Sequence, residues 1–126
     1  MTPKTFTGET EAQDCCAYWQ RQLRLSDWQV KIKIVRRYDL QPGRVAQCEY
    51  FITSKSAIIS LLDAIDFHPA TEFVDRDHEV GLVHELLHLH VALFEPKAET
   101  LEQKMSEVAI ESIAQALVLL NRGIRL

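Results

Sequence analysis

The chain has 126 residues, of which 47% are hydrophobic and 25% are charged, and its formal net charge is −4 at pH 7. This length suits one hydrophobic core, so we expect a single domain over residues 1–126. The negative charge gives no reason to expect nucleic acid or an anionic membrane as a partner, and no apolar run approaches the roughly 20 residues of a membrane span.

The cysteine content and the N-terminal sequence indicate in which cellular compartment the protein is expected. Three cysteines, two of them adjacent, do not make a disulfide framework: Cys15, Cys16 and Cys48. The first residues lack the apolar segment of a secretion signal. We therefore expect a cytoplasmic protein, in which Cys15 and Cys16 serve as small apolar residues of the first helix.

The first predicted elements are a helix and a strand. Residues 9–25 carry good helix formers, and apolar side chains recur near a 3.6-residue period at Cys15, Tyr18, Trp19 and Leu23. Residues 28–35 alternate apolar and polar, which predicts a strand with one solvent face. That alternation also explains Lys31 and Lys33 without a binding role.

Two more strands are predicted, over residues 45–52 and 57–62. Turn residues precede the first of them at 41–43 and separate the two at 53–56. Three strands joined by turns predict a mostly antiparallel meander. Residues 63–75 are then expected to form a loop.

A buried helix is predicted over residues 77–93, with Asp75 or Asp77 as its N-cap. Its apolar side chains point in nearly every direction, and a helix that is apolar all round is normally buried. A last helix is predicted over 101–121, with Thr100 as its cap and Gly123 as its end. The fold class expected is α+β: a helix, three strands, a buried helix and a C-terminal helix.

The buried helix carries the most informative motif of the chain, His84-Glu85-Leu86-Leu87-His88. Positions four apart share one face of a helix, so both imidazoles can reach the same point. Glu85 then lies near that point without occupying it, which is the arrangement of a catalytic zinc site with a general base. Chance would place this motif in roughly 2% of chains of this composition, so its context matters.

A zinc site of this kind needs a third protein ligand. His90 faces about 200° away from His88 around the helix, so it does not point at the same metal. The longer zinc motif His-Glu-x-x-His-x-x-Gly-x-x-His is excluded, because Phe94 occupies the position of its third histidine. Glu107 and Glu111 are one turn apart on the last helix and border its apolar stripe, so either can point at the metal. The alternative is that both are solvent-facing glutamates of an ordinary amphipathic helix.

This motif, followed by a loop and a helix that carries glutamates, resembles the gluzincin zinc metallopeptidases. The order of elements over residues 9–122 is similar to that of their small single-domain members, the minigluzincins, and of related proteins of phages and prophages. The resemblance implies a minimal zincin-like domain that hydrolyses peptide bonds with bound Zn²⁺. It implies His84 and His88 as metal ligands and Glu85 as the general base.

Peptidases of the ImmA/IrrE type carry their ligand glutamate six residues before a Phe-Ala pair. Ile113-Ala114 matches that pair, which implies Glu107 as the third ligand. An acidic residue one turn later supports a zinc histidine in larger gluzincins, which implies this role for Glu111. The reverse assignment of the two glutamates stays open.

The substrate expected is a peptide or a protein, paired by main-chain hydrogen bonds with one of the strands. Several side chains are candidates for stabilising the oxyanion, and the sequence does not choose among them: Tyr38, Tyr50, His68, Arg76 and His78.

One competing interpretation is a non-catalytic zinc protein that binds a partner. Another is that no metal binds and that His84 and His88 belong to the core.

Overall fold

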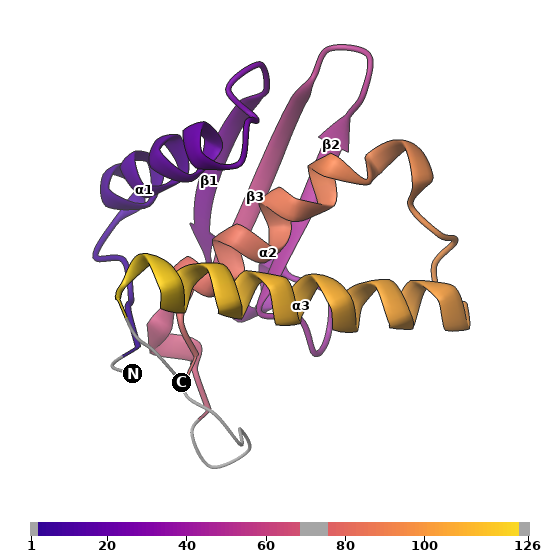
Figure 1. The fold of residues 1–126 in the computed structure, drawn as a ribbon. Coiled ribbons are helices and arrows are strands. Elements are labelled where there is room, and N and C mark those ends of the chain that lie inside the picture. Colours follow the sequence, from indigo (N-terminus) through magenta and orange to yellow (C-terminus); the bar gives the residue numbers. More distant parts are fainter. Residues whose placement is uncertain (1–2, 69–75, 124–126) are drawn as a thin grey trace.

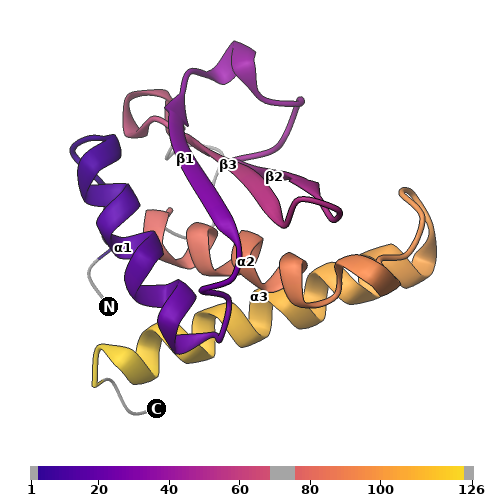
Figure 2. The same cartoon turned by 90° about the horizontal axis from the view of Figure 1, so that it is seen from above.

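The computed structural model describes residues 3–68 and 76–123 of the chain. They form a layered α+β arrangement in which all three α-helices lie on one side of a three-stranded sheet (Figures 1 and 2). Helices α1 and α2 lie against the sheet, and α3 crosses the outer side of α2. The elements in chain order are α1 (Glu9–Gln22), β1 (Gln29–Val35), η1 (Arg37–Asp39), β2 (Ala46–Phe51), β3 (Ser56–Leu62), η2 (Ala64–Asp66), α2 (His78–His90), η4 (Ala92–Phe94) and α3 (Leu101–Asn121).

The predicted fold class and order of elements are confirmed, but the meander is wrong. The strand order is β1-β3-β2, and β1 pairs with β3 in parallel while β2 pairs with β3 antiparallel. Only one of the two strand pairs is therefore antiparallel. The physical reason is that β3 is the most deeply buried strand and takes the centre, where apolar side chains gain most from burial. Residues 36–45, which include η1, form a connection long enough to carry the chain past β3.

The core lies between the sheet and the helices. In β1 and β3 the residues in register at its centre are Ile32 and Ile59, and Cys48 of β2 stands on the far side of Ile59. Helix α2 contributes the largest share of the buried helical residues, as its uniformly apolar composition predicts. None of the described helices has both the length and the apolar character that a membrane crossing demands.

The helix ends follow their local signals. Asp77 is the N-cap of α2, and its carboxylate accepts hydrogen bonds from the main-chain N–H groups of Glu79 and Val80 at 3.0 and 3.2 Å. The alternative cap, Asp75, lies outside the described residues. Thr100 caps α3 by accepting from the N–H of Gln103 at 3.1 Å. Helices α1 and α2 end three residues earlier than predicted, and η4 follows α2.

The two edges of the sheet differ. Side chains of α1 cap the outer edge of β1: Gln13 bonds the carbonyl of Val30 at 2.7 Å and the N–H of Ile32 at 3.0 Å, and Glu9 accepts from the N–H of Ile34 at 2.9 Å. No described residue does the same for β2. Because Val45 bonds Leu62 across the β2–β3 pair, alternation turns the main-chain groups of Ala46, Cys48 and Tyr50 away from β3.

Candidate metal centre

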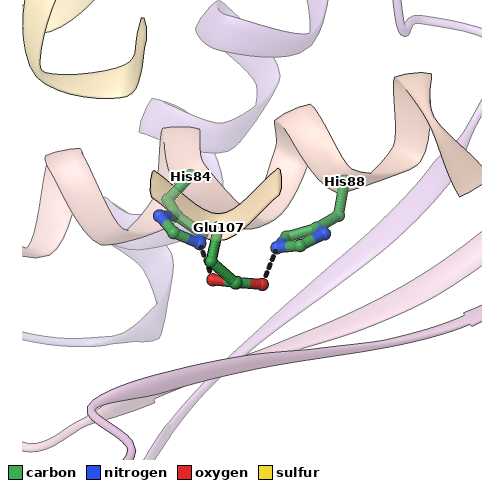
Figure 3. A group of neighbouring side chains, drawn as sticks. All are labelled: His84, His88 and Glu107. Atoms are coloured by element: carbon green, nitrogen blue, oxygen red, sulfur yellow. Dashed lines mark hydrogen bonds and ion pairs between the residues drawn. The ribbon is translucent and has the colours of Figure 1, made fainter. Parts of the chain in front are cut away.

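The centre of the candidate site is a group of three side chains from α2 and α3 (Figure 3). His84 and His88 stand one turn apart on α2, with their ring centroids 5.2 Å apart. Glu107 of α3 reaches between them: one carboxylate oxygen lies 2.9 Å from Nε2 of His84 and the other 3.0 Å from Nε2 of His88. One ligand atom from each residue lies within 4.8 Å of the others, so the group could hold a metal ion.

The outer ring nitrogens are held by two further carboxylates. Nδ1 of His84 lies 2.8 Å from Glu111, and Nδ1 of His88 lies 2.7 Å from Glu95. These contacts fix both rings so that each Nε2 faces Glu107. Glu107 therefore contacts the Nε2 atoms of both histidines, whereas Glu111 contacts only Nδ1 of His84.

Glu95 is a site residue that the sequence analysis missed. It lies beyond the end of α2, in the connection that follows η4, and its second carboxylate oxygen accepts a hydrogen bond from the hydroxyl of Tyr50 at 3.2 Å. Tyr50 belongs to β2, so this chain of contacts links the outer strand of the sheet to His88. Glu95 follows His88 by seven residues, but α2 ends at His90, so helical periodicity does not place Glu95, and the turn of η4 brings the two together.

Glu85 lies beside the group without joining it. Its side chain is buried, and its nearest carboxylate oxygen is 3.9 Å from Nε2 of His84. Burial raises the pKa of Glu85, although the neighbouring imidazoles oppose the shift. A carboxyl group with a raised pKa is suited to accepting and returning a proton near neutral pH.

The site holds more acidic than basic groups. Four glutamates gather around the two histidines and form ion pairs with these imidazoles: Glu85, Glu95, Glu107 and Glu111. Burial alone would lower the pKa of His84, but the hydrogen bond with Glu111 and the surrounding carboxylates raise it to about 9. The same hydrogen bond lowers the pKa of Glu111. A bound cation would balance this charge, so the donor set fits a metal.

A groove lies against the group, between the start of β2 and the helices. Apart from residues of the site, it is lined by Pro42, Gly43, Arg44, Val45, Ala46, Gly81 and Gln103. Arg44 adds a positive charge that lowers the pKa of Glu85, against the larger effect of burial. No sequence signal marks Arg44 or Gln103 as a site residue, because Arg44 follows a turn and Gln103 lies in the first turn of an amphipathic helix. A second, more apolar pocket shares Val45, Ala46, Gly81 and Glu111 with this groove.

The other candidate polar residues lie elsewhere or are occupied. The imidazole of His78 is buried and accepts from the N–H of Phe6 at 2.8 Å, which leaves its Nε2–H to donate to the carbonyl of Leu62 at 2.7 Å. Tyr38 is exposed on η1, and none of Tyr38, His68 and His78 lines the groove in the described part of the chain.

Two of the remaining predicted residues also stand apart from the three-residue group. His90 is at hydrogen-bonding distance, 2.7 Å, from the carbonyl of Leu23 at the end of α1. Arg76 lines the apolar pocket next to Glu111. Cys15, Cys16 and Cys48 are free thiols in this structure, and burial raises the pKa of Cys15 and Cys16 to about 12.

The chain was compared with protein-family models, with curated proteins and with solved structures, and no match was found in any of the three comparisons. The function is therefore inferred from the geometry and chemistry of the site. The observation of greatest weight is the convergence of His84, His88 and Glu107 beside a buried carboxylate.

Proposed function

We propose that the protein is a zinc-dependent metallopeptidase of gluzincin type, in which His84, His88 and Glu107 bind Zn²⁺ and Glu85 is the general base. The observation that carries this proposal is the meeting of three ligand atoms within 4.8 Å, with Glu85 close by but outside the group. A structural zinc site closes its fourth position with another protein ligand, whereas a catalytic site has three. Unlike Glu95 and Glu111, Glu85 has no hydrogen bond with either imidazole among the described contacts, which favours a site in which its carboxylate moves protons.

The donor set favours zinc over the hard cations. Two imidazole nitrogens and one carboxylate oxygen are ligands that zinc accepts readily, whereas Ca²⁺ and Mg²⁺ prefer sites built from oxygen atoms. The arrangement of the two glutamates supports Glu107 as the ligand, since it faces both Nε2 atoms. Glu111 bonds Nδ1 of His84, so it suits the role of fixing and polarising that ring.

When bound, Zn²⁺ would supply Lewis-acid polarisation of a water molecule and of the peptide carbonyl. Glu85 then accepts a proton from the attacking water as the new carbon–oxygen bond forms. It returns that proton to the amide nitrogen as the carbon–nitrogen bond breaks, which leaves a free carboxylate and an amine. Glu111 and Glu95 keep both imidazoles in the orientation that this chemistry needs.

The outer edge of β2 supports a peptide or protein as substrate. Its outward main-chain groups have no partner among the described residues, and the groove begins at its first residue, Ala46. An extended peptide could add to this edge as a further strand and so lie along the groove. Arg44 and Gln103 are the polar side chains of the lining that could contact its carbonyl groups, and the neighbouring apolar pocket could take a side chain.

The variant Glu85→Gln tests this proposal, because it removes the base without removing a ligand. Zinc content is measured by mass spectrometry, and hydrolysis is followed on a mixed peptide library. We expect one zinc per chain in both proteins and a loss of cleavage of at least about a thousandfold in the variant. The matched control is Glu102→Gln, an exposed glutamate of the same helix as Glu107, which should cleave like the original protein.

Two results would contradict the proposal. One is cleavage by Glu85→Gln at the original rate. The other is a protein that carries one zinc per chain but cleaves no member of the library, which would favour the non-catalytic zinc protein. The variant His84→Ala serves as the metal control, since it removes a ligand and should lose the zinc itself.

A further inference from the structure

The groove beside the candidate metal group carries one positive charge that no described side chain pairs with. Among the described residues that line the groove, Arg44 is the only arginine or lysine. The glutamates of the lining form ion pairs with His84 or His88, whereas no described carboxylate forms an ion pair with Arg44. An arginine keeps its charge at every pH at which proteins are folded. The groove therefore offers a fixed cation to whatever lies in it.

The main chain around Arg44 is held in a defined turn. The N–H of Arg44 donates to the carbonyl of Gln41 at 3.1 Å, and Gly43 takes the left-handed conformation that this turn needs, with a φ of 79°. The guanidinium of Arg37 donates to the carbonyl of Gln41 at 3.0 Å and also to the carbonyl of Arg44. Arg37 therefore holds the turn, while the side chain of Arg44 lines the groove.

The course of β2 places Arg44 at one end of the site. At the start of β2, Ala46 lies beside Gly81, since a Cβ atom added to this glycine would be 3.8 Å from Cβ of Ala46. Gly81 comes before both histidines of the metal group on α2. Towards the end of β2, Tyr50 bonds Glu95, which holds the second of these histidines. The strand therefore passes the two histidines in their chain order, and Arg44 lies before the first of them.

A peptide that adds to the outer edge of β2 in antiparallel orientation has its C-terminal part beside Arg44. Antiparallel pairing is slightly more stable per residue than parallel pairing. The charge favours the same orientation, because a parallel peptide would direct its N-terminal ammonium group towards a guanidinium. Two strand residues separate Arg44 from Ala46, and three helical residues separate Gly81 from His84. These steps amount to on the order of 11 Å, or about three residues of extended peptide.

We propose that Arg44 binds a carboxylate of the substrate on the C-terminal side of the scissile bond, within about three residues of that bond. This inference rests on the proposed function, because it takes the bond to be cleaved at the metal group. A guanidinium forms two parallel hydrogen bonds with a carboxylate, whereas a peptide carbonyl needs only a neutral donor such as Gln103. The carboxylate belongs either to the C-terminus of the peptide or to an aspartate or glutamate side chain.

Matched pairs of peptides test this inference and distinguish the two sources. Peptides that the zinc-loaded protein cleaves are first identified from the mixed library by mass spectrometry. Each is then made with a free or an amidated C-terminus, and with glutamate or glutamine at the first, second or third residue after the scissile bond. We expect kcat/KM to be at least about fivefold higher for the carboxylate member of one pair. That pair identifies the source of the carboxylate.

Variants of Arg44 connect this preference to the guanidinium. In Arg44→Gln the ratio of kcat/KM between the two members of the pair should fall to less than about twofold. In Arg44→Glu the ratio should invert, so that the neutral member is cleaved faster, which a residue that only holds the fold would not produce. The matched control is Arg21→Gln, an exposed arginine of α1, which should keep the original ratio. Circular dichroism checks that each variant is folded.

Binding gives a second measurement that does not depend on turnover. In the zinc-loaded variant Glu85→Gln, fluorescence anisotropy should show the carboxylate peptide bound at least about fivefold more tightly than its neutral counterpart, and adding Arg44→Gln should remove this difference. Equal cleavage of both members of every pair by the original protein would overturn the role of Arg44 and leave the peptidase proposal standing. A preference that survives in Arg44→Gln would do the same. A zinc-loaded protein that cleaves no peptide would instead contradict the proposed function, and this inference with it.

Discussion

Helix α2 carries two acidic clusters that are neutralised in different ways. At its start, Asp77 and Glu79 bind the guanidinium of Arg122 at 2.8 Å each. At its middle, the carboxylates around His84 and His88 form ion pairs with these two imidazoles, and Glu95 and Glu111 also accept hydrogen bonds from Tyr50 and Gln115. A guanidinium is always charged, whereas an imidazole is half charged near pH 6.5 in water. The first cluster therefore has a fixed charge balance, and the charge of the second depends on pH and on what it binds.

The first cluster is also fully hydrogen-bonded. The indole N–H of Trp19 donates to Glu79 at 2.7 Å, so the cluster connects α1, α2 and the end of α3. Burial alone would raise the pKa of both Asp77 and Glu79, but the bonds from Arg122 and from the other donors lower it. Such a cluster has a structural role, because each of its four carboxylate oxygens already accepts a hydrogen bond.

Removing the fixed cation should have the largest effect on stability. Arg122→Met leaves two buried carboxylates without their partner, so we expect the free energy of unfolding to fall by about 3–5 kcal/mol. Urea denaturation followed by circular dichroism measures this, with Arg21→Met on the exposed face of α1 as the control. Zinc content of the folded fraction should stay the same. A loss below about 1 kcal/mol would mean that the arginine cluster is not a fixed structural element.

The second cluster should be sensitive to alkaline pH once a chelator has removed metal. Because its surroundings raise the pKa of His84 from an ordinary 6.5 to about 9, the charged imidazole stabilises the fold fully below about pH 6.5. This contribution, up to about 3 kcal/mol, should disappear as the pH rises through 9. Thermal unfolding between pH 6 and 10 measures it, and zinc should abolish the dependence. A flat profile for the chelated protein would contradict this coupling.

Removing the outer carboxylate of His88 should weaken metal binding without unfolding the protein. Glu95→Ala takes away the contact that orients the ring, so zinc affinity should fall 10- to 100-fold in a competition titration with a chromogenic chelator. Tyr50→Phe removes only the more distant hydrogen bond and should cost less than about tenfold. If Glu95→Ala binds zinc like the original protein, His88 is oriented by other contacts.

The smallest effect concerns the segment of α2 between the two clusters. A Cβ atom added at Gly81 would lie 3.8 Å from Cβ of Ala46 and from Cδ2 of Leu61, which are ordinary contacts. Gly81→Ala should therefore stabilise the helix by about 0.5–1 kcal/mol in urea denaturation and leave zinc content unchanged. Destabilisation, or a loss of zinc, would contradict this expectation and show that the glycine is needed at this position.

The parts of the fold that depend on local periodicity could be predicted from the sequence. The i, i+4 spacing of His84 and His88, the buried composition of α2 and the caps at Asp77 and Thr100 are all properties of a few neighbouring residues. The strand order could not be predicted in the same way. Alternation identifies a strand and its buried face, but it does not say on which side of β3 the chain returns.

The same limit explains what was missed around the site. Glu107 and Glu111 border an apolar stripe of a regular helix, so their direction follows from helical geometry. Glu95 and Arg44 lie in connections, and their positions depend on how η4 and residues 36–45 turn in space. No local pattern marks such residues, and only the tertiary structure brings them to the histidines.

The capping of β1 by Gln13 and Glu9 has a consequence for self-association in crowded solution. A sheet with two unpaired edge strands can add further chains at both edges without limit, which is a common route to fibrous aggregates. Here side chains of α1 cover the edge of β1, so a further strand can be added only along β2. Two molecules that pair through β2 would leave neither sheet with an uncovered edge strand, so growth by strand addition would stop at the pair.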